Sequence, residues 1–181
     1  FELHREDQSV TADLLRDGSV MAAITSDASP VQGCRSVPLG MMRYRPMAAP
    51  GFVDRWFPAG PGPGQLGRAP MVVFDRLDRL QDDYLRPRAP AAEPPRHHVP
   101  ASRSFVDALV LGLGWGMLPD LQAREHLDAG RLVLLEPDAS VDVALHWQQW
   151  ALRTPGLDAV SAAIGAAAAG SLVRPAGLEP A

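Results

Sequence analysis

Cysteine is nearly absent from this chain: Cys34 is the single one, so no internal disulfide can form. Basic residues are also scarce, 17 against 21 acidic ones, which gives a formal net charge of −4. A surface that binds DNA phosphates needs the opposite sign, so we do not expect this chain to bind DNA by itself. The most apolar stretch, residues 105–118, is interrupted by Asp107 and by glycines. It falls short of the roughly 20 apolar residues that cross a bilayer.

No positively charged leader followed by an apolar segment opens the chain, which predicts a cytoplasmic protein without membrane contact. Hydrophobic residues make up 46% of the sequence and charged residues 21%, the composition of a chain that folds. A length of 181 residues suffices for one domain or for two small lobes.

The residue patterns of catalysis and of metal binding are missing as well. The pair at 97–98 is the only adjacent pair of histidines, and no second ligand pair stands at metal-binding spacing. The glycines of 112–116 do not have the dinucleotide-binding spacing. Nothing in the sequence places Cys34 beside a base such as His4 together with a third, orienting group. We therefore predict no catalytic residues, no enzyme activity, no cofactor and no metal.

Short apolar segments alternate with amphipathic ones along the whole chain. Residues 20–24 form a nearly continuous apolar run, typical of a strand buried on both faces of a parallel sheet. Longer strands are predicted at 37–49 and 141–150, and helices at 104–111 and 156–172. This alternation favours a layered α/β architecture over an all-α or all-β domain.

Two segments, residues 58–67 and 86–95, hold so many prolines and glycines that we expect loops there. Between them, residues 71–74 are predicted to form a strand. Residues 75–85 are ambiguous between a turn and a short helix.

The tryptophans could contact a cationic ligand or pack in the core. Trp147 and Trp150 fall on opposite faces of their predicted strand, so at most one of them can face a ligand. An indole face stabilises a cation by about 0.5–2 kcal/mol. Packing is the favoured interpretation for both of them and for Trp115.

Three segments carry a family resemblance: the capped helix and glycine-spaced strand at 102–119, Glu6-Asp7-Gln8, and His146-Trp147-Gln148-Gln149-Trp150. Together they resemble the effector-binding domain of LysR-type transcriptional regulators, and within that family the LysG/ArgP-like subgroup that senses basic amino acids. The resemblance covers nearly the whole chain.

The resemblance implies a type 2 periplasmic-binding-protein-like fold, in which two α/β lobes are joined by two crossover strands. Lobe I would comprise residues 1–44 and 148–181, and lobe II residues 45–147. The family's DNA-binding winged helix-turn-helix is absent from this chain, and its first regulatory strand and helix would precede Phe1. The ligand would lie in the cleft between the lobes.

A basic amino acid presents one carboxylate and two cationic groups. Ser102 and Ser104 offer hydroxyls and unpaired backbone N–H groups at the start of a helix, where the helix dipole favours an anion. Ser104 is expected to cap this helix, with Asp107 reaching back to it. We assign the ligand carboxylate to this end, although Ser104 could serve as a cap alone.

The cationic end of the ligand needs carboxylates. Residues 1–6 start with the alternation of a half-buried strand, and Glu6 and Asp7 lie at its end. Ser26 and Asp27 lie at the end of the next predicted strand, 20–24. Ligands of open parallel sheets lie beyond the carboxyl ends of the strands, so we expect both pairs to face the ligand. The alternative is that these carboxylates are solvated turn residues.

These residues predict a sensor in which lysine, arginine or a similar amino acid closes the lobes and so controls transcription of an amino-acid exporter gene. The resemblance further implies a homodimer or tetramer that contacts DNA only through the missing N-terminal domain. The alternative is a solute-binding domain of a transport system with the same fold.

Overall fold

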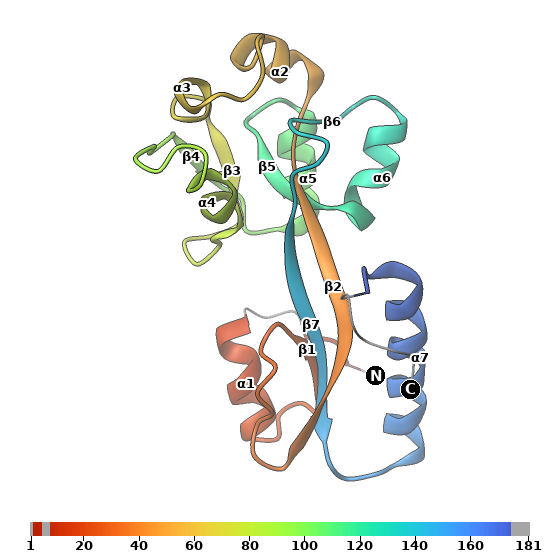
Figure 1. Ribbon diagram of the computed structural model, residues 1–181. Helices are drawn as coiled ribbons and strands as arrows, with labels where there is room; N and C mark the ends of the chain where they lie inside the picture. The colour runs from red at the N-terminus through yellow and green to blue at the C-terminus, as the bar shows by residue number, and fades with distance from the viewer. Residues whose placement is uncertain (1, 5–7, 175–181) are drawn as a thin grey trace. The chain divides into compact units, whose positions relative to one another are not determined.

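The computed structural model describes residues 2–4 and 8–174. They form two compact units: unit 1 runs up to Met42 and again from Asp142, and unit 2 is Arg43–Val141. The chain passes between the units within strand β2 (Cys34–Ala48) and at the start of strand β7 (Val141–Trp150) (Figure 1). These two strands were predicted at 37–49 and 141–150, and both predictions are confirmed. No helix in the described part of the chain is long and apolar enough to span a membrane.

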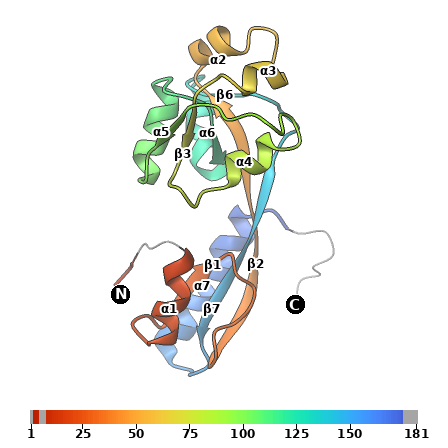
Figure 2. The same cartoon turned by 90° about the vertical axis from the view of Figure 1, so that its left-hand side faces the viewer.

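Unit 1 is built around β7 and β1 (Ala22–Thr25), with β2 on the other side of β7. Helices α1 (Gln8–Arg16) and α7 (Pro155–Ser171) lie on opposite sides of these strands (Figure 2). The amphipathic helix α1 buries Leu15, which is 1% exposed. Thr154 caps α7, because its hydroxyl accepts a hydrogen bond from the Leu157 amide.

The prediction of a doubly buried parallel strand at 20–24 is wrong. β1 pairs antiparallel with β7, from Ala22 opposite Gln149 to Thr25 opposite His146, and Ile24 is 47% exposed. An apolar run shows that a segment is extended, but it does not show which strand pairs with it or in which direction.

Unit 2 contains a sheet whose centre is the second half of β2. β5 (Gly116–Pro119) and β6 (Val133–Leu134) both pair antiparallel with β2. β3 (Met71–Val73) pairs parallel with β4 (Arg96–His98). Trp115, which precedes β5, accepts from the Val72 amide and donates its own amide to the Pro70 carbonyl, and so connects β3 to the β5 side. Unit 2 therefore mixes parallel and antiparallel pairs.

In unit 2, alternate residues of β2, β3 and β5 enter two different cores. Met71 and Val73 belong to one cluster and Val72 to the other. Helices α2 (Pro50–Trp56), α3 (Pro63–Leu66) and α4 (Leu80–Leu85) contribute side chains to the first cluster. Helices α5 (Ser102–Val110) and α6 (Asp120–Asp128) contribute side chains to the second. This gives the three layers, helix, sheet and helix, that the α/β prediction requires.

The segment 58–67 is not entirely loop, contrary to the prediction. It contains α3, whose first residue, Pro63, fits a helix start because its missing N–H would be unpaired there in any case. Leu66, which is 0% exposed, fixes the short helix on the core. The ambiguous segment 75–85 contains α4.

The glycine-spaced segment turns the chain from α5 into β5. Gly112 has φ +76°, the left-handed conformation that commonly ends a helix. A Cβ on Gly114 would lie 2.9 Å from the Pro70 carbonyl oxygen. These two glycines allow α5 and β5 to pack closely against β3.

Candidate functional site

The carboxyl ends of β3 and β4 meet at one edge of unit 2. The strands are parallel and in register, with Val73 opposite His98, and the Val99 amide donates to the Val73 carbonyl at 2.9 Å. The loop 74–78 follows β3, and α5 begins shortly after β4. Both segments therefore start at the edge where open parallel sheets hold their ligands.

Helix α5 begins earlier than expected. Ala101 has the extended conformation of an N-cap (φ −147°), and its carbonyl accepts from the Phe105 amide at 2.8 Å. Ser102 is thus the first helical residue and Ser104 the third, so the prediction that Ser104 caps the helix is wrong. Both serines remain in the first turn, where the backbone N–H groups concentrate positive potential. Ser102 is half-buried and Ser104 is exposed.

Asp75 and Asp78, which the sequence reasoning did not select, lie in the loop after β3. One oxygen of Asp78 accepts from the Phe74 amide at 2.9 Å and the other from the Leu80 amide at 3.1 Å. Oδ1 of Asp75 accepts from the amides of Leu77 and Asp78. Their position directly after an apolar strand was the signal that could have drawn attention to them. Because backbone donors already engage both oxygens of Asp78, it serves to hold this loop.

Burial raises the pKa of Tyr44, and the nearby charge of Asp78 raises it further. Tyr44 lies on β2, so Asp78 also marks where the loop after β3 approaches that strand. The phenol stays neutral at physiological pH.

In unit 1, Ser26 and Asp27 follow the carboxyl end of β1. The Asp27 side chain is exposed, and its Oδ1 accepts from the Ser29 amide at 2.9 Å. Because the side chain is exposed and a carboxylate can accept several hydrogen bonds, Asp27 can also receive a cationic group.

The structure thus brings Ser26 and Asp27 together after β1 and Ser102 and Ser104 together in α5. The first pair belongs to unit 1 and the second to unit 2. Glu6 and Asp7, the other predicted ligand residues, lie outside the described residues.

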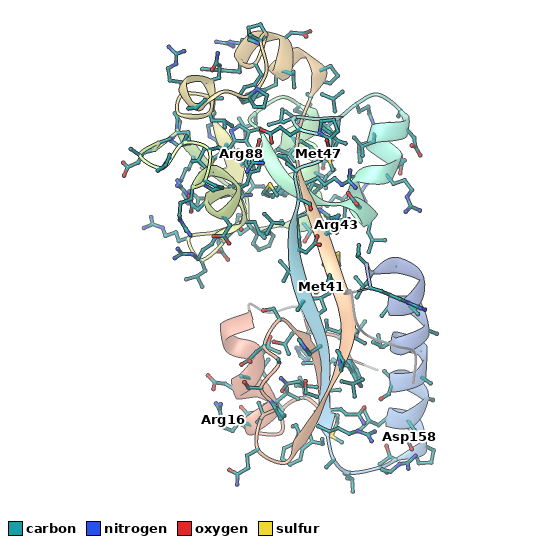
Figure 3. The ribbon with its side chains drawn as sticks, viewed as in Figure 1. Arg16, Met41, Arg43, Met47, Arg88 and Asp158 are labelled. Carbon is teal, nitrogen blue, oxygen red and sulfur yellow. The ribbon has the colours of Figure 1, made fainter. Side chains whose placement is uncertain are left out.

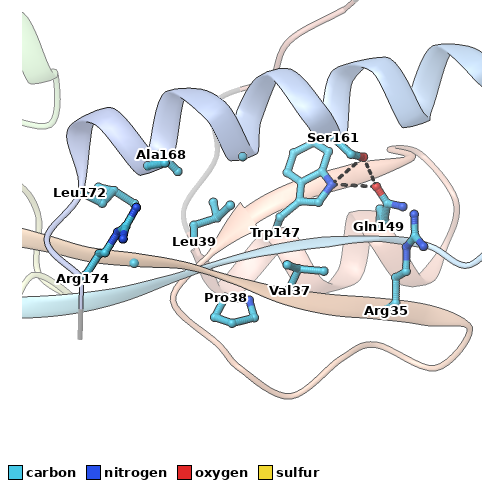
Figure 4. A pocket seen from close by; sticks show the side chains of 13 residues that line it. Arg35, Val37, Pro38, Leu39, Trp147, Gln149, Ser161, Ala168, Leu172 and Arg174 are labelled. Carbon is cyan, nitrogen blue, oxygen red and sulfur yellow. Dashed lines mark hydrogen bonds between the residues drawn. The ribbon is translucent and has the colours of Figure 1, made fainter. Parts of the chain in front are cut away.

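The tryptophans pack, as predicted. Trp115 is 0% exposed and meets the Tyr84 ring edge-on at a centroid distance of 5.4 Å. Trp147 faces α7, and its indole N–H donates to Gln149 at 2.7 Å and to Ser161 at 3.0 Å (Figure 4). Trp150 lies on the other face of β7, beside Gly33.

A pocket of about 410 Å³ lies within unit 1 between α7 and strands β2 and β7 (Figure 4). Its wall is mainly apolar, with the guanidinium groups of Arg35 and Arg174 among its lining. None of the four predicted ligand residues that the structure describes lines it.

A group formed by Arg88, Glu136 and Tyr84 stabilises unit 2 next to its core. Arg88, labelled in Figure 3, donates through Nε and Nη2 to Glu136, at 3.1 and 2.8 Å to one carboxylate oxygen. Its guanidinium also lies over the Tyr84 ring, 4.1 Å from the centroid. Burial and the charge of Glu136 raise the pKa of Tyr84. The remaining nitrogen, Nη1, donates to the Tyr84 carbonyl at 3.0 Å. Because all three guanidinium nitrogens bond within unit 2, we assign Arg88 a structural role.

Two features that catalytic sites use, a reactive cysteine and a metal ion, can be compared with the described residues. Burial raises the pKa of the Cys34 thiol, whereas an activated cysteine has a lowered one. Among residues 2–4 and 8–174, no three His, Cys, Asp or Glu side chains are grouped to hold a metal ion.

The family model described as LysR substrate binding domain matches residues 1–169, and the chain belongs to this family. It is 43% identical over 150 residues to the HTH-type transcriptional regulator ArgP of Pseudomonas fluorescens, covering 83% of this chain and 50% of that protein. It is 40% identical over 171 residues to the regulator LysG of Mycobacterium tuberculosis, covering 94% of this chain and 56% of that protein. The chain thus spans about half the length of these relatives, which are named as transcriptional regulators and not as enzymes.

Solved structures of regulators with the same names also resemble this chain. ArgP from Mycobacterium tuberculosis superposes with a TM-score of 0.91 at 38% identity, over 96% of this chain and 60% of that one. Full-length LysG from Corynebacterium glutamicum, with bound effector Arg, gives a TM-score of 0.83 at 36% identity, over 95% of this chain and 59% of that one. These neighbours confirm the type 2 periplasmic-binding-protein-like α/β fold.

Proposed function

We propose that this chain is the ligand-sensing domain of a LysR-type regulator and that its effector is a basic amino acid, lysine, arginine or a similar one. The observation that carries the proposal is the arginine bound as effector to the LysG relative, which is 36% identical to this chain. The regulatory lobes would be residues 1–44 with 148–181, and 45–147.

In the proposed site, different residues bind the cationic end and the carboxylate end of the ligand. Asp27, with Glu6 and Asp7, would receive the cationic end, because a carboxylate and a guanidinium or ammonium group form strong charge-assisted hydrogen bonds. Ser26 would add a hydroxyl beside Asp27. Ser102 and Ser104 would bind the ligand carboxylate together with the first-turn N–H groups of α5.

In the complete regulator, a DNA-binding domain outside this chain would report ligand binding at the promoter of an amino-acid exporter gene. Ligand binding shifts the regulator from one conformation to another only if the ligand has different affinities for the two conformations. We propose a homodimer or tetramer as the assembly in which this difference acts.

Calorimetric titration of the chain with lysine, arginine, histidine and glutamate tests the proposal. We expect at least one of the basic amino acids to bind and glutamate to give no heat of binding, because the site carries carboxylates. Binding of glutamate without binding of any basic amino acid would mean that the ligand class is wrong.

Asp27→Asn isolates the charge of the site. Asparagine keeps the oxygen that accepts from the Ser29 amide, so the turn should survive while the charge is lost. Because a hydrogen bond to a charged group contributes about 1.5–3 kcal/mol, we expect arginine affinity to fall roughly 10- to 100-fold. The melting temperature, measured in the same samples, should hardly change.

Asp17→Asn is the matched control for this variant. Asp17 accepts from the Ser19 amide in the same kind of turn, but it precedes β1 and does not follow it. We expect arginine affinity to stay within about twofold. If the two variants weaken arginine binding equally, Asp27 has no specific role.

A further inference from the structure

Gln148 connects strand β7 to the segment that follows β1. It is 2% exposed, and its Nε2 donates to the carbonyls of Asp27 at 2.8 Å and Ser29 at 2.9 Å. Its Oε1 accepts from the Val31 amide at 3.2 Å. Both amide hydrogens and the amide oxygen are therefore used on one short segment, residues 26–31, which carries Ser26 and Asp27.

The other hydrogen bonds shown for this segment are short-range. The Asp27 amide donates to the Thr25 hydroxyl, and the Ser29 amide donates to the Asp27 carboxylate. Such turns shape a loop locally but do not fix it to the rest of the fold. The contacts of Gln148 span 117 to 121 residues of sequence, and they attach the segment to the sheet.

We infer that Gln148 is a positioning residue for effector binding: it holds the backbone of Asp27 so that the side chains of Ser26 and Asp27 point in a fixed direction. This inference rests on the proposed function. Without the amide, the segment loses these three hydrogen bonds to β7, and ligand binding would have to order it. Pre-organisation of a polar contact in this way raises affinity without any contact between Gln148 and the ligand.

The neighbouring glutamine provides a matched control. Gln149 is 1% exposed, lies on the same strand and points to the opposite face. Its Oε1 accepts from the indole of Trp147 and from the hydroxyl of Ser161 on α7. Gln148 and Gln149 thus share type, burial and strand, and only Gln148 bonds to residues 26–31.

The experiment compares Gln148→Met with Gln149→Met, since methionine keeps the length of the side chain and removes its hydrogen bonds. Each variant is titrated with arginine and followed by hydrogen exchange of a peptide that covers residues 26–31. We expect Gln148→Met to lower arginine affinity about tenfold and to speed exchange at the Val31 amide. Gln149→Met should leave the affinity within about twofold, even where it lowers the melting temperature as much.

Each result has a distinct meaning. Equal losses of affinity in the two variants, or unchanged affinity in Gln148→Met with faster exchange at Val31, overturn the positioning role. Unchanged exchange at Val31 in Gln148→Met overturns the anchoring of the segment. Absence of arginine, lysine and histidine binding to the unmodified chain overturns the proposed function, and the role of Gln148 in effector binding with it. If Gln148→Met fails to fold, Gln148→Glu is measured in its place: it keeps the acceptor for Val31 and loses the donors to the carbonyls of Asp27 and Ser29, so arginine affinity should fall about tenfold while exchange at the Val31 amide stays unchanged.

Discussion

At the scale of single residues, Asp82 and Arg96 form an ion pair with two-point geometry. Nη2 of Arg96 lies 2.6 Å from Oδ1 of Asp82, and Nη1 lies 3.0 Å from Oδ2. The pair joins α4 to β4 and is about one-third exposed. The hydrogen bond from Arg96 holds the pKa of Asp82 below its usual value.

This lowered pKa predicts a pH dependence of stability. A carboxyl whose pKa is lower in the folded state stabilises the fold above its unfolded pKa of about 3.9, and that contribution is lost as the pH falls through the folded value. Asp82→Asn should therefore cost at most about 1 kcal/mol at neutral pH, because the pair is partly exposed. In urea unfolding series, the difference in the free energy of unfolding between Asp82→Asn and the unmodified chain should shrink below about pH 4. A difference that stays constant down to pH 2 would contradict the pair's contribution.

Sequence reasoning at this scale located the polar residues at strand ends but not their bonds. Ser104 has the residue type of a cap, yet Ala101 is the cap, because the helix starts where the backbone first turns. Asp27 and Asp78 have the same residue type after apolar strands, and only the structure shows that Asp27 is exposed whereas both oxygens of Asp78 accept hydrogen bonds from the backbone of its own loop.

At the scale of elements, the close approach of β5 to β3 depends on glycine. Gly114→Ala would place a Cβ 2.9 Å from a backbone oxygen, which cannot move aside as a flexible side chain could. We expect a loss of about 1–3 kcal/mol in the free energy of unfolding, measured with urea. Gly165→Ala, within α7 and with nothing within 4 Å of the added Cβ, should instead stabilise by up to about 1 kcal/mol. Equal effects of the two substitutions would contradict the steric argument.

Element types and most bounds followed from local patterns: β2, β7, α5 and α7 were all expected near their observed positions. The antiparallel direction of β1 could not be predicted, because its partner β7 is more than 100 residues away in the sequence. Residues 63–66 form a helix despite their prolines and glycines, since Leu66 enters the core. Tertiary contacts override local propensity in short segments such as these.

At the scale of the whole molecule, ligand binding should stabilise the fold. A ligand present at 100 times its dissociation constant adds about 2.7 kcal/mol if it binds only the folded state. For a chain of this size, that corresponds to a rise in melting temperature of roughly 5–10 °C with arginine. Glutamate at the same concentration and ionic strength is the control and should give no rise. A rise with both amino acids would indicate a general solute effect in place of specific binding.

The sequence by itself determined the α/β class, the order of the main strands and helices, and the family. These follow from the spacing of apolar residues and of the glycines at 112–116, which are properties of neighbouring residues. Only the tertiary structure decided the direction of β1, the two core faces of unit 2, and the attachment of residues 26–31 to Gln148. These depend on residues far apart in the chain, whose meeting is set by the packing of the sheets and helices and not by any local pattern.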